Sequence, residues 1–107
     1  MKRFISNYTI LGNGNEVINH IVTTGDDGKL ISILPFDREM ANTCYVPQPL
    51  CVVALCDKAD VEHIILECSS REQLKQRLSK SELSCPQAGM PVVVLRLDFA
   101  HNTLNLL

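Results

Sequence analysis

The stretch that decides the fold covers residues 3–34 and reads RFISNYTILGNGNEVINHIVTTGDDGKLISIL. Two polar, glycine-rich turns, at 12–15 and 25–28, divide it into three runs rich in apolar and β-branched residues. Asn-Gly and Asp-Gly pairs between such runs favour tight hairpin turns, because these residues tolerate positive φ. The stretch therefore predicts an antiparallel meander of three strands. These strands are expected at 3–11, 17–24 and 29–34.

The middle of the chain is less regular. Residues 37–42 are mostly polar and predict a loop or one helical turn, and Thr43–Val46 predicts a short strand. Leu50–Leu55 is an unbroken apolar run of the length of a buried strand. Asp57–Asp60 is expected to be a polar turn. In Val61–Cys68, two sets of alternate residues would point to opposite sides of an extended chain. We interpret this segment as a strand, with a helix as the alternative.

The last third predicts one helix followed by a hairpin. Ser69 and Glu72 match a capping box, and the helix is expected to run to Lys80. Leu74 and Leu78 lie four residues apart and place a narrow apolar stripe against a sheet. After a loop at 84–91, two strands are expected. They are Val92–Phe99 and Thr103–Leu107, with a short turn between them.

Taken together, these elements predict a mainly β to α+β fold within a single domain, residues 1–107. The expected architecture is a small antiparallel β-sandwich or a partly open barrel, with one helix near residues 70–80. A chain of 107 residues with 46% hydrophobic residues buries roughly two-thirds of its unfolded surface, which provides a core without disulfides or metals.

Composition excludes several classes of function. The net charge is −2, and a basic footprint of the kind that binds nucleic acid is missing. The longest apolar run, Leu50–Leu55, is far shorter than the roughly 20 residues of a membrane span. The amino terminus lacks the apolar segment of a signal peptide. The five cysteines form no Cys-x-x-Cys pair, and their number is odd, so a reducing, cytoplasmic setting is predicted.

The opening strands resemble those of a known enzyme superfamily. The relevant segments are Phe4–Leu11, Val17–Val22 and Asp27–Ile33, the last with its Asp-Gly-Lys and two isoleucines. They are similar to the small amino-terminal β-sandwich of the metal-dependent amidohydrolases, the family of cytosine deaminase, dihydroorotase and imidazolonepropionase. The resemblance covers the first third of the chain and continues more weakly from Thr43 to Ala54.

The chain departs from that family where catalysis begins. The family carries a His-x-His pair that binds the catalytic metal, and Leu55-Cys56-Asp57 stands in that place here. The family's catalytic barrel also needs roughly 250 residues. The resemblance therefore implies a fold fragment without the activity, without a metal and without another cofactor.

Four residues are candidates for a site of another kind. His63 follows Asp57 and Asp60, and a turn that brought these three together would offer metal ligands. The alternative is a solvated turn followed by a strand. Cys56 is a candidate nucleophile if a histidine approaches it, whereas the adjacent Asp57 disfavours the thiolate. The alternative is an inert cysteine at the end of a strand.

We therefore predict a non-enzymatic domain, an accessory or protein-binding module related in fold to the amidohydrolase small domain. The alternative is a small ligand- or metal-binding protein, or a thiol enzyme, that uses Cys56, His63, Asp57 and Asp60. A homodimer formed through the hairpin at 92–107 is a further possibility, because the Val92–Leu95 run is prone to association on a sheet edge. Neither nucleic acid nor membrane is an expected partner.

Overall fold

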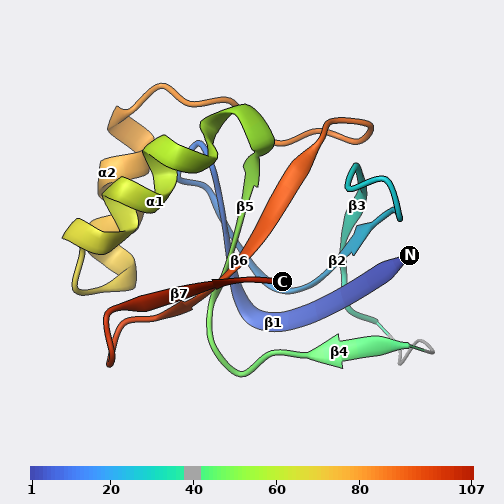
Figure 1. The fold of residues 1–107 in the computed structure, drawn as a ribbon. Coiled ribbons are helices and arrows are strands. Elements are labelled where there is room, and N and C mark those ends of the chain that lie inside the picture. Colours follow the sequence, from blue (N-terminus) through green and yellow to red (C-terminus); the bar gives the residue numbers. More distant parts are fainter. Residues whose placement is uncertain (38–41) are drawn as a thin grey trace.

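Strand β1 (Lys2–Leu11) organises the sheet, because it pairs with three other strands (Figure 1). The structure is a computed structural model that describes residues 1–37 and 42–107. Strand β2 (Glu16–Thr24) runs antiparallel to β1 over nearly its whole length. On the other edge of β1, strand β4 (Thr43–Tyr45) pairs with the first half and strand β5 (Leu50–Ala54) with the second half, both in parallel.

The remaining elements complete a seven-stranded sheet in the order β3-β2-β1-β5-β6-β7, with β4 beside β1. Strands β1, β2 and β3 form the predicted antiparallel meander, and β6 and β7 form the predicted final hairpin. A single 3-10 turn and two helices follow β5. The bounds of these elements are β3 (Leu30–Pro35), η1 (Leu55–Asp57), α1 (Lys58–Glu67), α2 (Arg71–Lys80), β6 (Val92–Asp98) and β7 (Thr103–Leu106).

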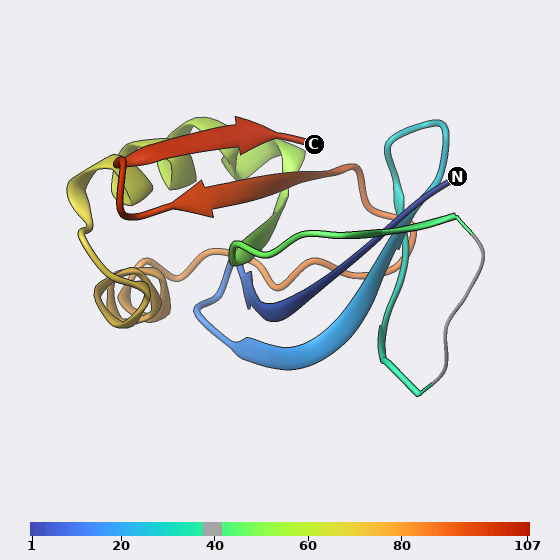
Figure 2. The ribbon, with the colours of Figure 1, turned by 90° about the horizontal axis from the view of Figure 1, so that it is seen from below.

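The sheet curls strongly but does not close, as the bent course of β1 and β2 in Figure 2 shows. The two sides of the curl meet at the start of β3. There, Leu30 N donates to Met90 O at 2.9 Å, and Val92 N donates to Gly28 O at 3.1 Å. These bonds tie the β2–β3 turn to the segment before β6. One curled sheet of this kind corresponds to the partly open barrel, not to two packed sheets.

Two apolar clusters cover the two faces of β5, and all five of its residues are buried. Cys51 and Val53 point toward the helices, whereas Leu50 and Val52 point into the curl. The helix-side cluster also holds residues of α1, α2 and β6, and the other cluster holds residues of β1, β2, β3 and β6. Because both faces of β5 are covered, an unbroken apolar run is the pattern that this strand requires.

Residues 61–67 are helical and Cys68 is the C-cap of the helix, so the prediction of a strand over 61–68 was wrong and its helical alternative holds. The buried residues of this segment are Val61, Ile64, Ile65 and Cys68. Their spacing of i, i+3, i+4 and i+7 places them on one face of a helix. The expected turn at 57–60 is likewise the end of η1 and the first turn of α1.

The second helix forms as predicted, but its cap is shifted by one residue. Ser70, not Ser69, is the N-cap, and its side chain accepts from Gln73 N at 3.3 Å. The reaching-back side chain is that of Gln73, not Glu72, because Gln73 Oε1 accepts from Ser69 N at 2.8 Å. The prediction of a capping box was thus right in kind and wrong in register.

The predicted class, mainly β to α+β, is confirmed, and two finer features differ. The sheet is mixed, not purely antiparallel, because β1 pairs in parallel with β4 and β5. The described chain has two α-helices where one was expected. Of the predicted loop or turn at 37–42, residues 38–41 lie outside the described part of the chain, and Asn42 lies in a turn with positive φ.

The turn between β1 and β2 packs directly on the backbone of α2. A Cβ atom added at Gly14 would lie 2.7 Å from Ser79 N and 2.8 Å from Lys75 O. Gly14 also has a φ of +90°, a conformation that side chains disfavour. Only glycine therefore allows this turn to touch the helix, whereas Gly28, with a φ of +80°, has open space around it.

Ion pairs bind the same helix to the first hairpin. Glu16 Oε2 lies 3.1 Å from Arg71 Nε, and Glu16 Oε1 accepts from Lys75 Nζ at 3.3 Å. The guanidinium of Arg71 lies 3.5 Å from the centre of the Tyr8 ring, at cation–π distance. The Glu16 side chain is only 12% exposed, so water screens these contacts weakly.

We expect Gly14→Ala to destabilise the protein far more than Gly28→Ala. Each change places alanine at positive φ, at a cost of about 1–2 kcal/mol. Only the first also forces α2 away from the turn, which adds about 1–3 kcal/mol. Urea unfolding followed by circular dichroism measures both variants. Equal losses for the two variants would contradict the close packing of this turn.

Glu16→Gln is expected to lower the free energy of unfolding by about 1–3 kcal/mol, because a weakly screened acceptor of two cations is lost. Glu72→Gln is the matched control, since Glu72 also contacts Arg71, at 3.4 Å, but its side chain is 70% exposed. We expect the control to cost less than about 0.5 kcal/mol. The same denaturant titration compares the two, and an equal loss would show that burial of Glu16 is unimportant.

Candidate functional site

The four candidate residues of the sequence lie along one continuous helical stretch, η1 followed by α1. Cys56 Sγ lies 3.8 Å from Asp57 Oδ1, its neighbour in the chain. His63 Nε2 lies 2.9 Å from Glu67 Oε1, one turn further along α1. Cys56 and His63 are seven residues apart, a separation of roughly 10 Å along a helix. The structure therefore does not bring the candidate nucleophile and the candidate base together.

Asp60 and His63 do border a common hollow of about 420 Å³ between α1 and the segment that follows α2. Its other lining residues are Ile64, Ser81 and Leu83. A cation would need three or four convergent ligands. Within residues 1–37 and 42–107, no group of three or more His, Cys, Asp and Glu side chains is placed to hold a metal ion.

Glu67 links the two helices at the surface. Its Oε1 contacts His63, and its Oε2 accepts from Arg77 Nη1 at 3.2 Å. The side chains of Glu67 and Arg77 are both nearly half exposed. Pairs in such a solvated setting contribute little to stability. We interpret this group as a surface link between α1 and α2, not as a proton-transfer chain.

Burial separates the cysteines into two groups. Cys51 and Cys68 are buried, whereas Cys44 and Cys56 are exposed and Cys85 is intermediate. Desolvation raises the pKa of the Cys51 thiol to about 12. Burial also raises the pKa of Cys68, against the opposing charge of Arg77. Neither buried thiol is therefore activated as a nucleophile at neutral pH.

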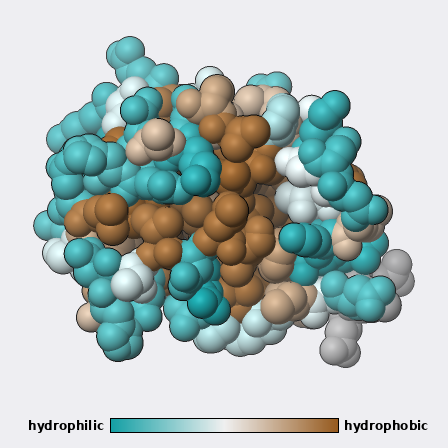
Figure 3. Space-filling view, in the orientation of Figure 1, coloured by the Kyte–Doolittle hydropathy of each residue, from teal (hydrophilic) through white to brown (hydrophobic). Residues whose placement is uncertain are grey.

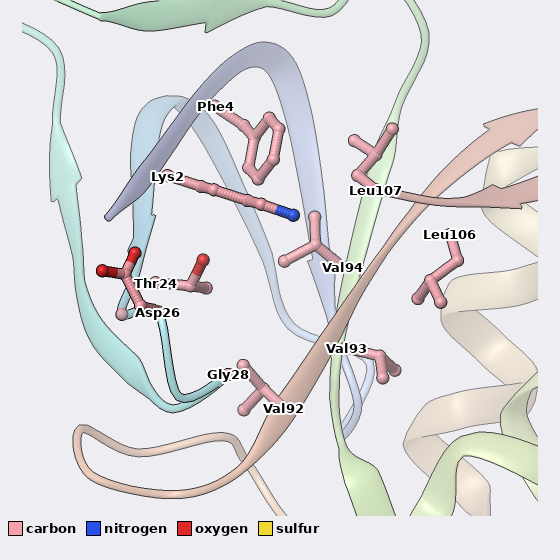
Figure 4. Close-up of a pocket in the computed structure, with 11 residues that line it drawn as sticks. Lys2, Phe4, Thr24, Asp26, Gly28, Val92, Val93, Val94, Leu106 and Leu107 are labelled. Atoms are coloured by element: carbon pink, nitrogen blue, oxygen red, sulfur yellow. The ribbon is translucent and has the colours of Figure 1, made fainter.

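A second hollow, of about 320 Å³, lies at the open side of the curl (Figure 4). The first residues of β1 form one wall, and β6 with the end of β7 forms the opposite wall. The β2–β3 turn borders it as well. The apolar side chains among its lining residues are Phe4, Val92, Val93, Val94, Leu106 and Leu107.

We call this space the β1–β6 hollow. Polar groups also border it. Figure 4 shows the side chain of Lys2 extended across it, with the ammonium between Phe4 and Val94. Asp26 is at the rim, where the amino group of Met1 contacts it. The Met1 amino group, with a smaller effect of Lys2, lowers the pKa of the Asp26 carboxyl.

An apolar band crosses the same side of the molecule. Figure 3 shows it as a continuous brown area over β6 and β7, bordered by polar side chains. Leu106 of β7 is 60% exposed, among the most exposed of the large apolar residues described. Apolar surface that is continuous in this way is typical of a binding surface, unlike single exposed residues.

Strand β7 is the last strand of the sheet, and its outer edge has no partner strand in the described chain. Leu107 N donates inward to Val94 O at 2.9 Å. Because backbone groups alternate along an antiparallel strand, the N–H and C=O of Leu104 and Leu106 point outward. The strand reads Thr-Leu-Asn-Leu and has no charge, although charged residues are the usual protection of such an edge.

Sequence reasoning missed the β1–β6 hollow, because its walls are far apart in the chain. Lys2 and Val94 meet only through the pairing of β1 with β5 and of β5 with β6. One signal did point to this region: the Val92–Leu95 run and the final hairpin were predicted as a contact surface. Nothing in the sequence indicated that Lys2 would lie against that surface.

The chain was compared with protein-family models, with curated proteins and with solved structures, and it matches none of them. Among the helices of the described residues, none has both the length and the apolar character needed to cross a membrane.

Thiol labelling of the native protein is expected to proceed in two steps. Cys44 and Cys56 react at once with an alkylating reagent at pH 8, because they are exposed. Cys51 and Cys68 react only when urea unfolds the chain. Burial keeps the reagent from reaching them, and it favours the protonated thiol, which is unreactive. Peptide mass spectrometry at successive times identifies each modified residue. Labelling of Cys51 as fast as Cys56 without denaturant would contradict this core.

Proposed function

We propose that this protein is a non-enzymatic interaction module, and that its partner is a second copy joined through strand β7. The observation that carries the proposal is the uncharged outer edge of β7 beside an exposed apolar band. Addition of a strand to a free edge is a common mode of protein recognition, in which backbone hydrogen bonds contribute to affinity.

The choice of β7 over the other end of the sheet follows from the surroundings of β3. The start of β3 is already bonded, since Gly89 N donates to Leu30 O at 2.8 Å and Leu30 N donates to Met90 O. Strand β3 also ends in Pro35, a residue that occurs on edges that proteins keep unpaired. Strand β7 has no proline, and its outer edge has no partner strand among residues 1–37 and 42–107.

A second copy fits this edge because the edge is self-complementary. Two antiparallel β7 strands related by a two-fold axis at Asn105 would place Leu104 opposite the partner's Leu106. Both are residues whose backbone groups point outward, so each such pair exchanges two hydrogen bonds. No charge of β7 faces a like charge in this arrangement, so the pairing meets no electrostatic penalty.

The non-enzymatic character is supported by the placement of the candidate residues. Cys56 and His63 contact different acids, and His63 is largely exposed. The alternative, a thiol enzyme or metal site that uses Cys56, His63, Asp57 and Asp60, therefore has less support. The relation to the amidohydrolase small domain remains a proposal that rests on residues 3–34. Five unpaired cysteines support a cytoplasmic setting.

The test is the mass of the protein in solution as a function of concentration. A four-residue strand offers few hydrogen bonds, so we expect a dimer with a dissociation constant of roughly micromolar order. Leu106→Lys is expected to give a monomer, because it places two ammonium groups at the new strand pair. Size-exclusion chromatography with light scattering, checked by sedimentation velocity, measures both proteins.

Leu34→Lys is the matched control. Leu34 lies on β3 at the opposite end of the sheet, and its exposed fraction, 59%, nearly equals the 60% of Leu106. This variant is expected to dimerise like the unchanged protein. A monomeric unchanged protein at its highest soluble concentration would overturn the proposal, and so would equal loss of the dimer in both variants.

A further inference from the structure

Lys2 is an exposed residue whose side chain lines the β1–β6 hollow. Its ammonium makes no hydrogen bond and no salt bridge with the part of the chain that the structure describes, residues 1–37 and 42–107. The carboxylate among the described lining residues, that of Asp26, is engaged by the amino group of Met1. Figure 4 shows the Lys2 side chain directed into the hollow and the Asp26 carboxylate directed away from it.

The walls around this cation are apolar. Phe4 and Val92 are at most 9% exposed, and Val94 is 4% exposed, so these wall residues belong to the folded core. Thr24 adds one hydroxyl on the wall formed by β2. The chemistry that complements one cation beside an apolar wall is one anionic group attached to an apolar body.

Charge and size narrow the class of ligand. A phosphate or another multiply charged anion would need several available cations, whereas Lys2 is the one cationic side chain of the described lining and the Met1 amino group is already paired with Asp26. A volume of about 320 Å³ is at the lower end of the range of small-molecule sites. This volume suits a single aliphatic chain more than a two-chain lipid or a fused ring system.

We propose that the β1–β6 hollow binds an aliphatic monocarboxylate. The Lys2 ammonium holds the carboxylate, and the aliphatic chain lies against Phe4, Val92 and Val94. This binding activity goes beyond the proposed strand pairing, because it uses a face of the sheet and not the outer edge of β7. The competing explanation is that the methylene groups of Lys2 merely cover apolar surface, as lysine stems often do.

The experiment compares three probes that share one chain and differ in head-group charge. Octanoate, octanol and octylammonium are titrated into the protein, residues 1–107, at pH 7.5. Binding is followed by isothermal titration calorimetry and by the backbone and methyl NMR signals of the hollow. We expect saturable binding of octanoate with shifts at Thr24 and Val94, at least ten-fold weaker binding of octanol, and none of octylammonium.

Two lysine variants separate the proposal from simple coverage of apolar surface. Lys2→Ala is expected to weaken octanoate binding at least ten-fold and to leave octanol binding unchanged or stronger. Lys2→Arg keeps the charge and is expected to keep most of the affinity. Lys29→Ala removes an exposed cation of the nearby β2–β3 turn that does not line the hollow, and it is expected to have no effect.

Several outcomes would overturn the proposal. Equal affinity for octanoate and octanol would show that the charge of Lys2 is not used. Unchanged octanoate binding in Lys2→Ala, or shifts confined to another part of the protein, would show that the site is elsewhere. Failure of octanoate to saturate at millimolar concentration would show that the hollow is not a carboxylate site. The pairing of β7 is tested separately, by the mass of the protein in solution, so failure of that proposal and failure of this one are distinguishable.

Discussion

The parallel pairing of β1 with β5 is the contact on which the rest of the fold depends. Parallel neighbours require a long connection, and here β2, β3, β4 and the segments between them form it. The pairing places the unbroken apolar run of β5 at the centre of the sheet, where both faces must be covered. The helices cover one face, and the curl of the meander covers the other.

The same pairing explains where the molecule is hollow. Strand β5 pairs with β1 only at Thr9, Ile10 and Leu11. Nearer the amino terminus, at Arg3, Phe4 and Ile5, β1 pairs with β4 instead. The first half of β1 thus diverges from β5, and no strand of the described residues fills the space between it and β6. Side chains of both strands line that space, and the bonds between the β2–β3 turn and residues 89–92 limit it at one end.

Local sequence patterns were sufficient to predict the hairpin turns and the second helix, because residues close together in the chain determine these elements. The turns at 12–15 and 25–28 predicted the meander, and serines before a charged helix predicted α2. In Val61–Cys68, two neighbouring isoleucines fit both a strand and a helix, and only packing on β5 decides between them. The relation of Gly14 to α2, and of Lys2 to β6, depends on strand order, which no local pattern contains.

The candidate sites differ from the rest of the molecule because each departs from a rule that the other elements follow. Most sheet edges in proteins carry charge or proline, and β7 carries neither. Lysine stems often lie along apolar surface, but no other cationic side chain lines the hollow beside Lys2 in the described chain. Departures of this kind cost stability or solubility, and proteins concentrate them at functional sites.

The free edge of β7 and the β1–β6 hollow both lie around the final hairpin, where Leu106 borders the hollow and also belongs to the free edge. The hairpin therefore has chemistry that the fold alone does not require, whereas α1 carries its candidate residues in ordinary solvated pairs.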